Sequence, residues 1–121
     1  QFAQYDRYKT HNSALFADIQ KGSGASAGPG KKIVIVYRAW TTDGTLVDTS
    51  KQNDKGQYVP FEFSYGDKGI LPGLQQGLDG MKVKGTRMII VPPAVGYGPN
   101  KYKNIPGNSV LIFEVYLVNV K

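Results

Sequence analysis

The pattern of apolar and polar positions predicts mostly short strands. Residues 61–66 (FEFSYG) place three aromatic rings on one face and two polar side chains on the other, which is the period of a half-buried strand. Residues 33–40 (IVIVYRAW) are β-branched and aromatic, and the dipeptide Asp43-Gly44 after them predicts a hairpin. Both faces of residues 109–120 are largely apolar, so this strand should lie near the centre of a sheet. Further strands are expected at residues 15–19, 46–47 and 86–91.

A different period predicts one short helix. Leu74, Leu78 and Met81 recur at i, i+4 and i+7, which forms a single apolar stripe. Pro72 suits the first turn of a helix, where a missing N–H costs little, and Gly80 stands where the helix should end. We therefore expect a helix of about two turns.

Together these elements predict an α+β domain of about five strands and one short helix, with an antiparallel sheet folded over the helix, spanning residues 15–121. Residues 1–14 follow neither period. They are interpreted as an N-terminal extension, and its aromatic residues Phe2, Tyr5 and Tyr8 could dock on a protein partner.

Composition narrows the class of protein. At 121 residues with 40% hydrophobic content the chain suits one globular domain, and without cysteine it has neither disulfides nor thiolate metal sites. No apolar run is long enough to span a bilayer. The net charge of +6 comes from scattered lysines rather than a basic run, which argues against nucleic-acid binding. The first residue is Gln1, which fits removal of a leader or a shortened chain. The first option favours a lumenal or periplasmic protein over a cytoplasmic one, and the compartment stays open.

Few groups for ordinary catalysis are present. His11, the single histidine, lies in the extension, metal-ligand spacing is absent, and the glycine-rich loop before Lys31 lacks a phosphate-binding pattern. No metal or other cofactor is expected. The remaining chemistry is aromatic, so the rings form either the core of a β-rich domain or an apolar pocket for a ligand.

Four blocks of the chain resemble one known family. VYRAWTTDGTLVDTS, PFEFSYGDKGILPGLQQGLDGMKVKGTRMIIVPP, VGYG and IPGNSVLIFEV are similar, in order and spacing, to the FKBP family of peptidyl-prolyl cis–trans isomerases. The resemblance covers about residues 16–121 and leaves residues 1–14 outside. It implies an antiparallel sheet of five to six strands wrapped over one short helix. It also implies a pocket between helix and sheet that binds proline-containing polypeptides and, in the family, macrolides.

The resemblance also implies roles for individual residues. Tyr37 and Asp48 would form a hydroxyl–carboxylate pair, the N–H of Leu71 would bond a substrate carbonyl, and the Tyr97 hydroxyl would hold the peptide. Asp48 has a second interpretation, as an anchor for Tyr37 and the hairpin. The remaining implied catalytic residues are Phe61, Ile70, Leu74 and Phe113, and the implied substrate-binding residues are Val47, Phe63 and Ile105.

Two positions depart from the family pattern. Leu74 stands where the pocket floor is usually Trp, and Val47 stands where a wall is usually Phe. Losing about 50 Å² of contact at each would cost on the order of 1 kcal/mol per site. Macrolide binding should therefore be weakened more than catalysis. Two functions stay open: an isomerase that helps proteins fold, or a non-catalytic binding module that serves as a subunit or assembly factor of a larger complex.

Overall fold

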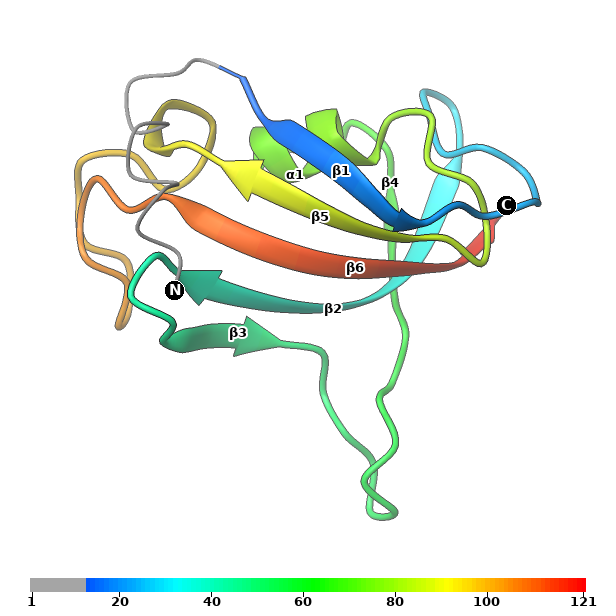
Figure 1. Cartoon of the computed structure of the whole chain (residues 1–121), viewed down its shortest axis with the longest axis horizontal. Helices are drawn as coiled ribbons and strands as arrows, with labels where there is room; N and C mark the ends of the chain where they lie inside the picture. Colours follow the sequence, from blue (N-terminus) through cyan, green and yellow to red (C-terminus); the bar gives the residue numbers. More distant parts are fainter. Residues whose placement is uncertain (1–12) are drawn as a thin grey trace.

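The computed structural model describes residues 13–121 and has one helix and six strands. The elements in chain order are β1 (Leu15–Gln20), β2 (Lys32–Thr41), β3 (Leu46–Thr49), β4 (Phe61–Ser64), α1 (Pro72–Leu78), β5 (Thr86–Val91), a short 3-10 turn η2 (Pro93–Val95) and β6 (Leu111–Val120). All strand pairs are antiparallel, and α1 lies across one face of the sheet (Figure 1). The predicted α+β class is confirmed.

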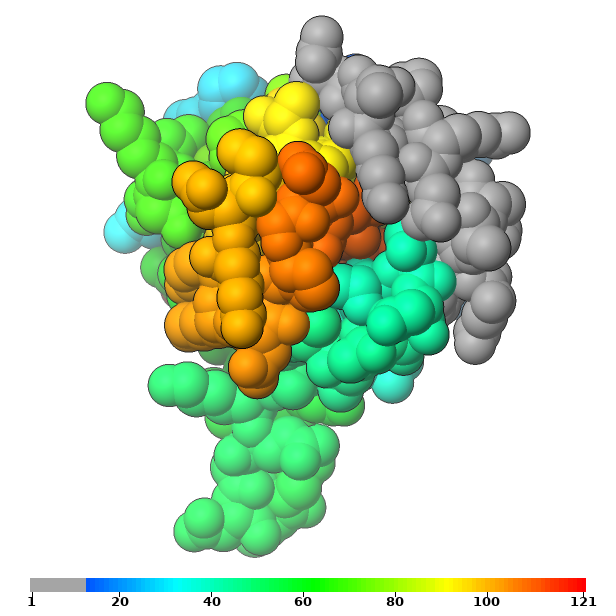
Figure 2. Space-filling model, turned by 90° about the vertical axis from the view of Figure 1, so that its left-hand side faces the viewer, coloured from blue at the N-terminus to red at the C-terminus, as the bar shows by residue number. Residues whose placement is uncertain are grey.

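The sheet runs in the order β1-β5-β6-β2-β3, with β4 also paired to β2. As predicted, the last strand is central, because β6 pairs with both β5 and β2. Strand β2 pairs with β6 along one edge, and its other edge is long enough for two further strands. Residues 32–35 of this strand pair with β4, and residues 38–40 pair with β3. The connection between β3 and β4 therefore leaves the sheet and returns to it. Its residues 51–60, called the finger below, project from the body of the molecule and are all exposed (Figures 1 and 2).

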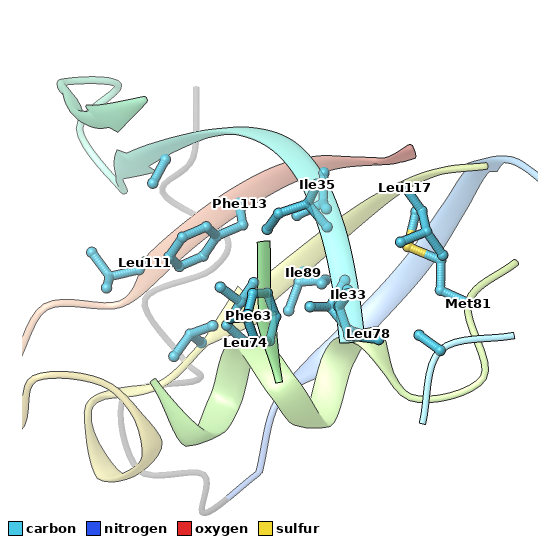
Figure 3. Packing of buried hydrophobic residues seen from close by; sticks show 14 of the residues in the cluster. Ile33, Ile35, Phe63, Leu74, Leu78, Met81, Ile89, Leu111, Phe113 and Leu117 are labelled. Carbon is cyan, nitrogen blue, oxygen red and sulfur yellow. The ribbon is translucent and has the colours of Figure 1, made fainter. Parts of the chain in front are cut away.

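Helix α1 is placed by packing more than by its own propensity, since seven residues are too few for an independently stable helix. Pro72 is in its first turn, and the chain leaves the helix at Asp79 and Gly80, where Gly80 has a φ of 79°. The stripe of Leu74, Leu78 and Met81 is buried against the sheet, as predicted (Figure 3). The helix thus fixes the position of Leu74 relative to Phe113 on β6.

The close approach of α1 to β5 depends on a glycine. A Cβ atom at Gly77 would stand 2.3 Å from Cγ2 of Ile89, a distance that atoms in real proteins do not reach. Ile89 is fully buried beneath the helix. Gly77 therefore lets the helix backbone lie directly on β5.

A buried arginine ties three elements together. Arg87 on β5 is 5% exposed and forms an ion pair with Asp18 on β1 at 2.7 Å. Its Nη1 donates to the carbonyl oxygens of Gly77 at 2.8 Å and Asp79 at 3.2 Å, which are at the C-terminal end of α1. Those carbonyls have no partner within a helix, so Arg87 satisfies them and completes its own hydrogen bonding.

The remaining features to compare with the sequence are the N-terminal extension, the connection after β5 and membrane-spanning helices. The extension falls almost entirely on residues 1–12, outside the described residues. The connection between β5 and β6 contains η2 and a small bridge between Tyr102 and Ile105. Within residues 13–121, no helix has the length and apolar character needed to cross a membrane.

Candidate functional site

A pocket of about 250 Å³ lies between α1, the inner face of the sheet and the β5–β6 connection. Its walls come from β2, the end of β3, the start of β4, the chain entering α1, and β6. All eight residues to which the resemblance gave catalytic roles line this pocket: Tyr37, Asp48, Phe61, Ile70, Leu71, Leu74, Tyr97 and Phe113. Ile35, Gly69 and Tyr102 complete the lining. Segments far apart in the sequence thus converge on one small pocket.

Aromatic rings form two walls of the pocket. The rings of Tyr37 on β2 and Phe113 on β6 lie 6.1 Å apart at 43°, a tilted pair within the favourable range for aromatic contacts. Phe113 is 4% exposed, whereas Phe61 at the mouth is 43% exposed. The pocket is therefore buried at its base and open at its rim.

The three predicted substrate-binding residues lie elsewhere. Phe63 shares a face of β4 with Phe61, as the alternation predicted, but it pairs with Ile33 deeper in the sheet and is buried in the core. It supports the ring of Phe61 from behind at 5.7 Å and does not line the pocket. Val47 and Ile105 line an adjoining hollow of about 140 Å³, which shares Asp48, Tyr97 and Tyr102 with the main pocket.

The predicted hydroxyl–carboxylate pair is present. The Tyr37 hydroxyl donates to Oδ2 of Asp48 at 3.0 Å, and Oδ1 of Asp48 accepts the N–H of Thr49 at 2.8 Å. Burial of the phenol, reinforced by the nearby Asp48 carboxylate, raises the pKa of Tyr37 well above its ordinary value. Tyr37 therefore stays a neutral hydrogen-bond donor at physiological pH.

A buried glutamine shapes the rim that carries Ile70 and Leu71. Gln75 of α1 is 8% exposed, and its Nε2 donates to the carbonyl oxygens of Asp67 at 2.9 Å and Ile70 at 3.2 Å. Its Oε1 accepts the N–H of Gly66. Gln75 thereby holds residues 66–70 against the helix. The N–H of Leu71 has no acceptor within residues 13–121, so it is available to a ligand.

The opposite side of the mouth is formed by two stacked tyrosines. The rings of Tyr97 and Tyr102 lie 4.2 Å apart and are nearly parallel, at 10°. Tyr102 is fixed by a tight turn in which the backbones of Tyr102 and Ile105 exchange two hydrogen bonds, with Ile105 buried below. Burial is the main cause that raises the pKa of Tyr97. Among the described residues, no acceptor takes the Tyr97 hydroxyl proton.

Sequence reasoning did not single out Gln75 or Tyr102. A buried polar residue in a helix of seven residues gives no local sign of its role, because its partners are backbone groups of another segment. Tyr102 lies in a loop without periodicity. The one available sign was its place among glycines and prolines in a long connection, where functional residues often occur.

A larger hollow of about 400 Å³ lies on the other face of the sheet. It is lined by Arg38, Glu114 and Tyr116, among others, and the guanidinium of Arg38 is paired with the Glu114 carboxylate at 2.5 Å. Its charged groups already satisfy each other and it has no buried apolar base, so it is a poorer candidate for a ligand site.

The chemistry that the main pocket can perform is non-covalent. Its polar groups are a paired carboxylate, neutral phenols and a backbone N–H, and none of the lining side chains is a Ser, Cys, Lys or His. In the part of the chain that the structure describes, no group of three His, Cys, Asp or Glu side chains converges to hold a metal ion.

Comparison with known proteins identifies the family. The model of the family described as FKBP-type peptidyl-prolyl cis-trans isomerase matches residues 24–118. The chain belongs to this family. The match begins in the connection between β1 and β2 and runs through nearly all of β6, so it includes every element that lines the pocket.

The names of curated relatives agree with this family assignment. FK506-binding protein 3 of Yarrowia lipolytica is 43% identical over 104 residues, which are 86% of this chain and 24% of that protein. An FK506-binding protein of Neisseria meningitidis serogroup C is 36% identical over 109 residues, which are 89% of this chain and 96% of that protein. The chain spans about a quarter of the length of the first of these, and about half of a chloroplastic relative in Arabidopsis thaliana, FKBP16-4.

Solved structures share the fold of this FKBP-type chain. FkpA from Escherichia coli superposes with a TM-score of 0.78 at 26% identity, covering 99% of this chain and 57% of that one. A peptidyl-prolyl cis-trans isomerase from Pseudomonas syringae pv. tomato also gives a TM-score of 0.78, at 18% identity, covering 99% and 90% of the two chains. The second likeness concerns the fold alone.

Proposed function

We propose that this chain catalyses the cis–trans isomerisation of X–Pro peptide bonds and so assists the folding of proline-containing polypeptides. The observation that carries the proposal is the convergence of eight separate residues on one pocket with a buried base. The rim of that pocket carries the Leu71 N–H and the Tyr97 hydroxyl, and neither donor has an acceptor within residues 13–121. Membership of the family supports the same reaction.

The reaction suits a site without reactive side chains. Rotation about an amide has a barrier of about 18–20 kcal/mol, because resonance gives the C–N bond partial double-bond character. For X–Pro bonds the uncatalysed exchange takes tens to hundreds of seconds. The twisted amide has less charge separation than the planar one, so transfer from water into an apolar pocket favours the twist. A rate gain of about 10⁴ needs only about 5.5 kcal/mol of preferential binding to the transition state.

In this proposal the prolyl ring packs among Tyr37, Phe61, Leu74 and Phe113. The N–H of Leu71 and the Tyr97 hydroxyl bond carbonyl oxygens on either side of the rotating bond, and so hold the flanking chain still. Tyr37 donates to Asp48 and therefore leaves no unpaired polar group at the wall. Asp48 acts by fixing Tyr37 and the β2–β3 hairpin.

The volume of the pocket bears on its ligands. Sites for drug-sized molecules usually measure about 300–1,000 Å³, and this pocket measures about 250 Å³. A single prolyl residue is the better match. Relatives are named FK506-binding proteins, and we expect FK506-type macrolides to bind this chain weakly, since Leu74 replaces a ring at the floor.

A protease-coupled or exchange-NMR assay on an X–Pro peptide tests the proposal. Phe113→Ala should lower kcat/KM at least a hundredfold, because it opens the driest wall, and Tyr97→Phe should lower it about tenfold, the value of one hydrogen bond. The matched control is Tyr116→Phe, which removes a phenol from the opposite face of the sheet. No acceleration by the unaltered chain at micromolar concentration would contradict the proposal.

A second candidate is a non-catalytic binding module within a larger assembly. The observation that favours it is the aliphatic floor at Leu74, which leaves fewer ring faces around the prolyl residue. In that case a proline peptide would shift the NMR signals of the pocket without faster isomer exchange. Deletion of residues 1–14 tests the proposed partner site: co-purification of the partner should be lost while the peptide still binds.

A further inference from the structure

Six exposed lysines gather at one end of the molecule, although they come from three separate stretches of the sequence. The connection between β1 and β2, the connection between α1 and β5 and the C-terminal end of β6 meet at this end (Figure 1). The surface that these lysines form is called the basic end below, and its members are Lys21, Lys31, Lys32, Lys82, Lys84 and Lys121. The fold therefore concentrates charge that is scattered along the sequence.

Backbone hydrogen bonds hold these three stretches against one another. Ser26 in the connection between β1 and β2 forms a β-bridge with Lys82, and the N–H of Lys84 donates to a carbonyl oxygen of β6 at 2.8 Å. Lys32 and Lys121 exchange two backbone hydrogen bonds, at 3.2 and 2.9 Å. The backbone under the lysines is thus fixed before a ligand arrives, which reduces the entropy lost on binding.

Acidic side chains near the basic end do not neutralise it. Glu62 of β4 is paired with Lys121 at 2.8 Å, and Asp18 is paired with the buried Arg87 at 2.7 Å. Asp79, at the end of α1, is the other acid in these stretches. Within residues 13–121, five of the six lysines have no ion-pair partner. The basic end therefore carries much of the net charge of +6.

The basic end is hollowed at one point. A depression of about 260 Å³ is lined by Lys21, Lys82 and Arg87, together with Asp18. The guanidinium of Arg87 occupies both carboxylate oxygens of Asp18, at 2.7 and 3.3 Å. The two ammonium groups are therefore the free charges of the depression, and a carboxylate placed between them would be attracted by both.

The chemistry of this surface favours an acidic polypeptide over a nucleic acid or a membrane. Its free cations are all lysines, which are compact point charges, whereas phosphate recognition usually relies on the planar fork of arginine. Within residues 13–121, none of the large exposed apolar side chains lies in the two connections that form this end. Side chains of that kind would be needed to stack on bases or to enter a lipid surface.

We propose that the basic end binds a segment rich in Asp and Glu on a partner polypeptide. The connection between β5 and β6, which forms one side of the pocket mouth, lies at the opposite end of the molecule (Figure 1). An acidic segment bound at the basic end therefore leaves the pocket open to a prolyl residue. Exposed ion pairs are individually weak and are screened by salt, so the Kd should be about 10–100 µM at low salt.

Titration with a proline-free polyglutamate peptide at low salt, followed by calorimetry, tests the proposal. Lys82→Glu combined with Lys84→Glu should raise the Kd at least about tenfold. The matched control is Lys101→Glu combined with Lys103→Glu, in the connection between β5 and β6. It has the same spacing and change in net charge, and the second lysine of each pair has a positive φ, 75° at Lys84 and 50° at Lys103. This control should raise the Kd about twofold at most.

A second control places the same change of charge on the finger, as Lys51→Glu combined with Lys55→Glu. It should also raise the Kd about twofold at most. In NMR spectra, saturating polyglutamate should shift the amide signals of Lys82 and Lys84 and leave the signal of Tyr97 at the pocket mouth unchanged. Circular dichroism establishes that each variant is folded, and Lys→Gln pairs at the same positions replace any Lys→Glu pair that is not.

Four results would overturn the proposal. One is the absence of polyglutamate binding at low salt. Another is equal weakening by the three double variants, because affinity would then follow net charge and not this surface. A third is a shift confined to the pocket signals, which would place the peptide in the main pocket. Tighter binding of a DNA duplex or of phosphatidylserine vesicles than of polyglutamate, compared at equal salt, would overturn the assignment to an acidic polypeptide.

Discussion

Replacing Gly77 by alanine tests the contact that places the pocket floor. Gly77 lies in α1 directly over Ile89, and an added Cβ would stand 2.3, 2.8 and 2.9 Å from Cγ2, Cγ1 and Cδ1 of that side chain. Ile89 is fully buried, so it cannot turn away into solvent. The helix must therefore lift from β5, and Leu74 must move with it.

Two opposing free-energy contributions set the effect of Gly77→Ala on stability. Alanine favours the helix over glycine by about 0.8–1.0 kcal/mol. Overpacking a filled core costs about 1–3 kcal/mol, and an overlap this close belongs at the upper end. We expect Gly77→Ala to lower the free energy of unfolding by about 1–2 kcal/mol in net terms. It should also raise KM for a proline peptide, because the shifted helix carries Leu74 away from Phe113.

Urea denaturation followed by fluorescence measures this change, since Trp40 is the single tryptophan. With a slope of about 1.5 kcal/mol per molar urea, the midpoint should fall by about 1 M. Gly28→Ala is the control, because its Cβ would meet one atom, Asp79 Oδ1, at an ordinary 3.5 Å. Its midpoint should change little.

A double-mutant cycle with Ile89→Ala decides whether the overlap is the cause. Ile89→Ala alone should cost about 2–5 kcal/mol by leaving a cavity. In that background the methyl group of Gly77→Ala enters the cavity, so it should stabilise instead of destabilise, with a coupling of about 1–3 kcal/mol. Strict additivity of the two changes, or a Gly77→Ala chain about 1 kcal/mol more stable than the original as propensity alone predicts, would refute the reasoning.

Four further predictions concern individual side-chain contacts. Arg87→Met should lower the free energy of unfolding by about 2–3 kcal/mol in urea titrations, because it leaves the helix-end carbonyls and Asp18 without their donor. Arg87 also lowers the pKa of Asp18, so stability measured across pH should fall once pH drops below about 4, and Asp18→Asn should flatten that fall. The raised pKa of Tyr37 means that the folded state keeps a proton that the unfolded state releases above about pH 10, so alkaline unfolding should be less steep for Tyr37→Phe. Tyr102→Ala should lower kcat/KM about twofold to tenfold, mainly through KM, while Tyr102→Phe keeps the ring stack and the rate.

Local periodicity predicted those helices and strands in which the apolar positions of the segment are the ones that the fold buries. The stripe on α1, the two apolar faces of β6 and the alternation on β4 all reappear in the structure. Strand β1 shows the limit of such patterns. Its sequence is largely apolar, yet all six of its residues are exposed, because among residues 13–121 it is the edge of the sheet and pairs with β5 alone. The composition of this segment predicts a strand. How far its side chains are buried depends on its place in the strand order, which the segment itself does not encode.

Polar residues inside the molecule were harder to interpret. The alternation of β5 places Arg87 on the same face as Ile89 and Val91, which is a sign of burial that the sequence contains. What the sequence does not contain is the partner, since Asp18 lies 69 residues away. Gln75 poses the same difficulty, because it bonds backbone carbonyls that any residue could supply. Position relative to distant segments, and not residue type, gives these side chains their roles.

The candidate site followed more readily from the resemblance than from pattern, and the division between its residues has a physical basis. The eight residues expected to act on the bond line one pocket, whereas Val47 and Ile105 line the adjoining hollow and Phe63 lies behind Phe61. A residue can match a family position and still lie behind the residues that line the pocket. Sequence similarity predicts the path of the backbone, but the packing of neighbouring side chains decides which of them reach the pocket. Leu74 illustrates the converse. It is 6% exposed and still lines the pocket, so an aliphatic floor remains dry. Since isomerisation depends on dryness and on donors at the rim, whereas macrolide affinity depends on contact area, the leucine should separate the two properties and reduce the second far more than the first.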